Sequence, residues 1–141
     1  MRSAMTILLA ACSGLLWGAL AHGLEVAHAL PIALVAGLTV GLLMGFLVKP
    51  LRDVDWPAAA ALSLLGLYVA VVLFAAAYSV GDLVTSRQSL ANWPAAIAEA
   101  CWDFAWGLSL SGYVFLLWPL SFANHTMVWW CQRRNNVIPA K

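Results

Sequence analysis

The sequence has very little charge. Asp, Glu, Lys and Arg make up 9% of its 141 residues, whereas hydrophobic residue types make up 64%. A chain of this composition lacks the polar surface that a soluble domain presents to water, so we expect an integral membrane protein. The formal net charge of +1 supplies no extended electrostatic field, and we expect no nucleic-acid partner.

Charge is also missing from the centres of the long apolar runs. Proton relays and ion-coupled transporters keep ionisable groups there, so a proton-coupled transporter acting alone is not expected. The three cysteines, Cys12, Cys101 and Cys131, form no CxxC pair. Nucleophilic side chains and histidines do not converge in a catalytic set, and we expect no enzyme activity.

Four apolar segments are present, each close to the length of about 20 residues that a transmembrane helix needs. They cover about residues 5–22, 29–48, 57–80 and 102–122. None has the alternating pattern of a membrane β-barrel strand. The sequence therefore predicts an all-α, polytopic integral membrane protein, with residues 1–141 forming a single bundle of four transmembrane helices.

A short interfacial segment is expected on the outer side before the last span. There Asn92 suits a helix cap, and Pro94 is tolerated in the first turn that follows. Within the last span, Pro119 cannot donate a backbone hydrogen bond and should kink the helix. The helix is expected to continue past this kink towards Trp130.

Basic residues predict the orientation, because short loops rich in Lys and Arg stay on the cytoplasmic side. With four spans, only Arg87 would lie on the outer side. The other six cations fall on the opposite side, which we assign to the cytoplasm: Arg2, Lys49, Arg52, Arg133, Arg134 and Lys141. Both termini are therefore expected to be cytoplasmic, and we expect the membrane to be the bacterial inner membrane.

Tryptophans gather near the predicted membrane boundaries. Their amphipathic rings favour headgroup depth, so we expect anchors rather than stacking on a cofactor. The expected anchors are Trp56, Trp93, Trp102, Trp118, Trp129 and Trp130.

Small residues recur at every fourth position in several spans, which lets helix backbones approach closely. The expected packing positions are Gly14, Gly18, Gly37, Gly41, Gly45, Gly107 and Ser111. We expect the stripe of the second span, a glycine zipper, to pack within this chain. The alternatives are packing against another subunit or copy, and a lipid, quinone or pigment lying in the groove.

One cluster near the first outer turn has residue types that ligate metals. His22, Glu25 and His28 follow at intervals of three, and imidazole and carboxylate bind Zn, Cu or Fe. They would share a face only in a continuous helix, which Gly23 disfavours. We expect polar capping of a turn here, with metal or haem ligation as the alternative. His125 is expected at the other membrane surface, and no particular cofactor follows from the sequence.

Several function classes fit these features. The first is a non-catalytic accessory or structural subunit of a larger membrane complex, packing through its small-residue ridges. The alternative is a homo-oligomeric channel or transporter component, with either the glycine stripe or Ser109 and Ser111 lining a path. A third is a membrane subunit that binds haem, metal, quinone or pigment. The expected partners are the lipid bilayer and either other membrane subunits or further copies of this chain.

Overall fold

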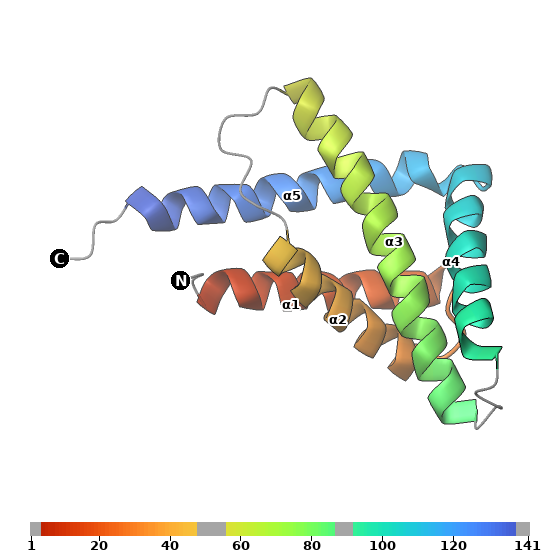
Figure 1. Cartoon of the computed structure of the whole chain (residues 1–141). Coiled ribbons are helices and arrows are strands. Elements are labelled where there is room, and N and C mark those ends of the chain that lie inside the picture. The colour runs from red at the N-terminus through yellow and green to blue at the C-terminus, as the bar shows by residue number, and fades with distance from the viewer. Residues whose placement is uncertain (1–3, 48–55, 87–91, 138–141) are drawn as a thin grey trace.

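The computed structural model describes residues 4–47, 56–86 and 92–137. These residues form five helices and no strand, which confirms the all-α prediction for this part of the chain (Figure 1). The helices are α1 (Ala4–Gly23), α2 (Leu30–Leu47), α3 (Trp56–Ser86), α4 (Trp93–Leu110) and α5 (Tyr113–Val137).

Only α3 is long and apolar enough by itself to cross a membrane, among the helices described. The apolar parts of α1 and α2 are shorter and cover Ile7–Gly23 and Leu30–Gly45. Helix α4 and the segment Tyr113–Met127 qualify only as a pair, and the two are bent by 97°. The prediction of a four-span bundle is therefore not confirmed.

The structure corrects the continuous last span expected over residues 102–122. Helix α4 ends at Leu110, and Gly112 adopts a φ of +74° before α5 begins. A left-handed residue ends the helical hydrogen-bond pattern, and glycine adopts this conformation without the steric cost of a Cβ. Pro119 lies inside α5. The 97° bend therefore lies at the break around Gly112, whereas Pro119, where we expected the kink, lies within α5.

The expected interfacial segment and the first part of the expected last span form one helix, α4. Asn92 occupies the N-cap position without a side-chain capping hydrogen bond, and a proline stands in the first turn. Helix α3 is correspondingly longer than expected, because it continues to Ser86. The outer connection is thus much shorter than its polar composition indicated.

Helix α1 ends in a Schellman motif, the paired hydrogen bonds that close many helix C-termini. Val26 donates its backbone N–H to the carbonyl of Ala21 at 3.0 Å, and Glu25 donates to that of His22 at 3.0 Å. Glu25 takes the left-handed position with a φ of +59°. This turn reverses the chain, and α2 packs back along α1.

Helix α3 is the central element and contacts α2, α4 and α5 (Figure 1). Helix α5 also packs against α1 and so closes the assembly on one side. The core forms two clusters of buried residues. One contains Ala27, Ala33, Ala36, Val40 and Phe74, and the other contains Leu67, Leu108 and Leu117.

The predicted orientation was based on seven basic residues, and the structure describes none of their side chains. Arg2, Lys49, Arg52, Arg87 and Lys141 lie outside the described residues, and the side chains of Arg133 and Arg134 are not described. The cytoplasmic position of both termini therefore stays a prediction.

Candidate functional site

Glycines of α1 and α2 meet each other along the hairpin. A Cβ added to Gly41 would lie 2.7 Å from the Cα of Gly14, and one added to Gly37 would lie 2.9 Å from the Cα of Gly18. Because these neighbours are backbone atoms, no side chain can move aside to make room. We call these four residues the glycine seam. It brings the two backbones together within one chain.

The other predicted packing positions differ. Gly45 faces the side chain of Ala10, whose Cβ would lie 2.7 Å from an added Cβ. At Gly107 an added Cβ would meet nothing within 4 Å. Ser111 is exposed and its hydroxyl donates to the carbonyl of Gly107. Thus neither Gly107 nor Ser111 serves a close helix contact. Both border a cavity, as do Gly14, Gly37, Gly41 and Gly45.

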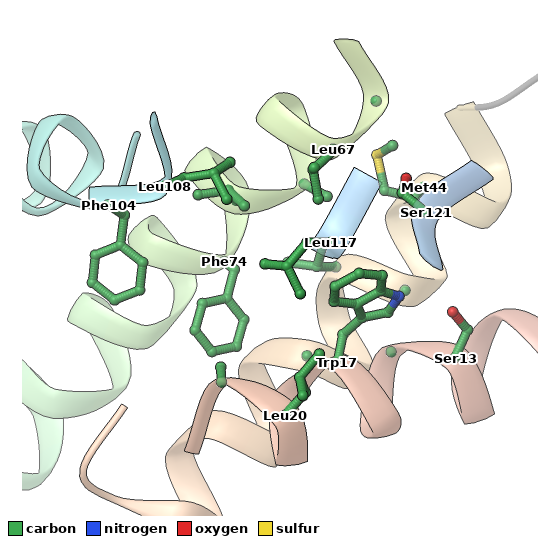
Figure 2. Close-up of a pocket in the computed structure, with 18 of the residues that line it drawn as sticks. Ser13, Trp17, Leu20, Met44, Leu67, Phe74, Phe104, Leu108, Leu117 and Ser121 are labelled. Atoms are coloured by element: carbon green, nitrogen blue, oxygen red, sulfur yellow. The ribbon is translucent and has the colours of Figure 1, made fainter. Parts of the chain in front are cut away.

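This central cavity has a volume of about 500 Å³ and is lined by residues of all five helices. Sites for small organic ligands typically have volumes of about 300–1,000 Å³ and mostly apolar walls. The labelled apolar side chains of Figure 2 are Trp17, Leu20, Met44, Leu67, Phe74, Phe104, Leu108 and Leu117. The cavity thus has the size and lining of a small-molecule site.

One end of the cavity is aromatic. Phe74 of α3 and Phe104 of α4 have ring centroids 6.1 Å apart and are tilted by 44°. Tyr78 stacks on Phe74 from one turn further along α3, with centroids 6.0 Å apart. Figure 2 shows the two phenylalanines on the side of the cavity away from Ser13 and Ser121. This end can hold apolar groups but offers few hydrogen bonds.

The opposite end carries four hydrogen-bonding side chains. Asn124 of α5 donates its Nδ2 to the hydroxyl of Ser13 of α1 at 2.8 Å. The Nδ1 of His125 donates to the backbone carbonyl of Ser121 at 2.8 Å. We call Ser13, Ser121, Asn124 and His125 the polar end; all four line the cavity.

A glycine makes room for the histidine of this polar end. A Cβ added to Gly66 of α3 would lie 3.2 Å from both Cε1 and Nε2 of His125. A larger residue at position 66 would therefore press on the ring. Because the carbonyl partner of Nδ1 accepts only, Nδ1 carries the proton and the neutral ring leaves Nε2 as an acceptor.

Helix α5 is held in this position by hydrogen bonds to α3. The indole Nε1 of Trp118 donates to the hydroxyl of Ser63 at 3.0 Å and to the carbonyl of Ala60 at 3.1 Å. One turn later, Ser121 donates its hydroxyl to the carbonyl of Ser63 at 3.3 Å. These bonds fix the register that brings Asn124 and His125 to the cavity.

This polar end was not predicted from the sequence. We expected His125 at the membrane surface and assigned no role to Asn124 or Ser13. A signal was present, because Ser121, Asn124 and His125 follow at spacings of three and four residues and so share one face of a helix. That face points inwards only because α5 crosses α3 and α1, which no local pattern specifies.

The structure does not gather the candidate metal ligands. His22 uses its Nδ1 to donate to the carbonyl of Ala27 at 2.8 Å, which closes the turn after α1. Glu25 and His28 are exposed. Across the described ranges, no group of three or more His, Cys, Asp or Glu side chains could hold a metal ion.

The predicted tryptophan anchors fall into three groups. Trp56, Trp93 and Trp102 are exposed. Trp118 is half-buried and directs its indole N–H into α3. The side chains of Trp129 and Trp130 lie outside those described. Trp118 thus has an internal contact that its place near a predicted boundary did not indicate.

Comparisons of the chain with protein families, with curated proteins and with solved structures find no match. The central cavity and its polar end are therefore the features of the molecule from which we infer a function.

Proposed function

We propose that this chain is a non-catalytic integral membrane protein that holds a small apolar or amphipathic molecule in its central cavity. The observation that carries the proposal is the cavity of about 500 Å³, which is bordered by all five helices, has mostly apolar walls and carries four hydrogen-bonding side chains at one end. Such a combination of apolar walls and a few polar groups is typical of sites that bind and orient a small molecule.

The distribution of exposed and buried side chains supports a membrane location for the other helices as well as for α3. Large apolar residues are highly exposed on several helices, including Leu16 at 71%, Leu110 at 77% and Phe115 at 78%, whereas the polar Ser63 is fully buried. Apolar surface on this scale costs about 25 cal/mol per Å² in water but nothing comparable in lipid. We propose that the whole bundle lies in the bilayer with cytoplasmic termini.

The glycine seam gives no support to the accessory-subunit role, which was the first expectation from the sequence, because its glycines face each other within one chain. The glycines of α1 and those of α2 already pack against each other, so they offer no free ridge to a partner helix. An accessory subunit and a homo-oligomeric channel remain predictions, and no contact among the described residues favours either one.

Native mass spectrometry of the full chain, purified gently from its own membrane, tests the proposal. We expect an additional bound mass of a small molecule, which solvent extraction would then identify. A tightly associated subunit or second copy would be seen in the same spectrum.

A matched pair of variants locates the bound molecule. Leu117 lines the cavity and is 8% exposed, whereas the neighbouring Leu116 is 57% exposed. We expect Leu117→Trp to fill the cavity and remove the bound mass, and Leu116→Trp to retain it. A bound mass that both variants retain equally would contradict the cavity function, as would its absence from the parent protein.

A further inference from the structure

The polar end has the composition of a recognition site for one kind of head group. We propose that it binds the uncharged oxygen head group, a hydroxyl or a carbonyl, of a single-tailed amphiphile whose tail extends towards Phe74 and Phe104. This inference rests on the cavity function proposed above, and it adds the class of ligand and the direction in which the ligand lies.

The direction follows from the two ends of the cavity along α3. Gly66 contacts the ring of His125, and Phe74 contacts Phe104. These two positions are eight residues apart on one helix, which corresponds to a separation of roughly 12 Å at 1.5 Å per residue. A polar group at one end and an apolar tail at the other would each meet matching surroundings.

The chemistry of the head group follows from the hydrogen-bonding capacity that the protein leaves unused. Among the described residues, Asn124 makes one side-chain hydrogen bond, from an N–H to Ser13, which leaves its second N–H and its carbonyl oxygen for a ligand. The Ser13 hydroxyl accepts that bond and still has its own proton to donate. His125 offers Nε2 as an acceptor. The polar end can therefore donate to a ligand carbonyl and accept from a ligand hydroxyl.

The charge of the lining formed by the described residues favours a neutral head group over an anionic one. No Lys or Arg belongs to the cavity lining found within the described residues, so a phosphate or carboxylate would have no cationic partner there. The one acidic lining residue, Asp103, is exposed and precedes Phe104 at the aromatic end. Burying an unpaired charge in such a site is costly, whereas a neutral oxygen needs only hydrogen bonds.

Three radiolabelled probes with the same ten-carbon tail test the head-group assignment. Decylubiquinone carries carbonyl oxygens, 1-monodecanoylglycerol carries hydroxyls and an ester, and decyl phosphate carries an anion. Equilibrium binding is measured on the full chain in phosphatidylcholine nanodiscs, with empty nanodiscs subtracted. We expect saturable binding of at least one neutral probe, with decyl phosphate at least about tenfold weaker because it lacks a partner for its charge.

Substitutions at the polar end then distinguish the two kinds of neutral head group, the quinone carbonyl and the glycerol hydroxyl. Asn124→Leu should weaken the neutral probe about tenfold, as loss of one buried hydrogen bond implies. The adjacent Ala123→Leu, on an exposed position of α5, should not. His125→Phe keeps a ring over Gly66 but removes the acceptor. It should weaken the glycerol probe, whose hydroxyls can donate, and leave the quinone unchanged, because a quinone has no hydroxyl to donate.

The outcomes distinguish this inference from the function on which it rests. Gly107 lines the cavity and has open space at its Cβ, so Gly107→Leu obstructs the cavity without a clash. Suppose that Gly107→Leu and Leu117→Trp abolish binding. The head-group assignment is then wrong if decyl phosphate binds to the parent protein as tightly as the neutral probes do, or if Asn124→Leu weakens all three probes alike. If neither obstructing variant weakens any probe, the cavity function itself is wrong.

Discussion

The indole of the half-buried Trp118 and the hydroxyl of the fully buried Ser63 join α5 to α3. Nε1 of the tryptophan donates to Oγ of the serine at 3.0 Å, and the serine is 0% exposed. In a protein that also exposes many large apolar side chains, a polar bond to a buried residue helps to specify which helix face turns inwards. It holds the polar end of the cavity in register.

Trp118→Phe should therefore lower the free energy of unfolding by about 1–2 kcal/mol, since it removes the donor and part of the packing. Ser63→Ala should cost less, because the carbonyl of Ala60 remains as a second acceptor at 3.1 Å. Titration with a denaturing detergent measures both. Trp102→Phe, at a 64% exposed position, is the control, and an equal loss there would show that the hydrogen bond contributes nothing.

The glycine seam gives a second prediction, based on two glycines in opposite surroundings. At Gly41 an added Cβ would lie 2.7 Å from the Cα of Gly14, but at Gly107 it would meet nothing. We expect Gly41→Ala to destabilise the protein by about 1–3 kcal/mol, the usual cost of overpacking. Gly107→Ala should be neutral or stabilising by up to about 1 kcal/mol, because alanine favours helix.

The same detergent titration compares the stability of the two variants. Crosslinking between chains tests whether either variant changes the association of the protein with other chains. If the stripe served a partner rather than α1, Gly41→Ala would leave the isolated chain as stable as Gly107→Ala does and would change only its association with other chains. That pattern would contradict the seam as an internal contact.

The sequence predicted what depends on local pattern and missed what depends on how helices cross. The all-α class, the helix start near Asn92 and Pro94, and the close-packing spacing at Gly37 and Gly41 were all readable, because each is a property of neighbouring residues. The polar end was not, since Ser13 and Asn124 are separated by most of the chain. Their meeting depends on the bend at Gly112, which the stronger local signal at Pro119 concealed.

Glu25 gives a third prediction, because it occupies a position that favours glycine. Glu25 lies just after the end of α1, at the left-handed position of the Schellman motif, and has a φ of +59°. A side chain in this conformation costs about 1 kcal/mol, so Glu25→Gly should stabilise the fold by about that amount. Glu25→Gln removes the charge but keeps the backbone conflict and should change little. If the glutamine variant gains as much stability as the glycine variant, the charge and not the backbone is responsible.

The bend between α4 and α5 gives the last prediction. Gly112 has a φ of +74°, and the two helices meet at 97°. Gly112→Ala should cost about 1–2 kcal/mol, the penalty for an L-residue in the left-handed region, and should shift the chain towards a more open bend. Pro119→Ala should leave the angle unchanged, because the proline lies inside α5, beyond the break.

Distances between spin labels on exposed positions of the two helices measure this angle directly. Labels at positions 102 and 120, which are exposed in α4 and α5, would replace the native side chains in a variant without Cys12, Cys101 and Cys131. A more open bend carries the two labels apart, so Gly112→Ala should lengthen or broaden the distance distribution and Pro119→Ala should not. If Pro119→Ala alone lengthened it, the proline would set the direction of α5. The position of the polar end against α1 would then depend on the proline instead of the glycine.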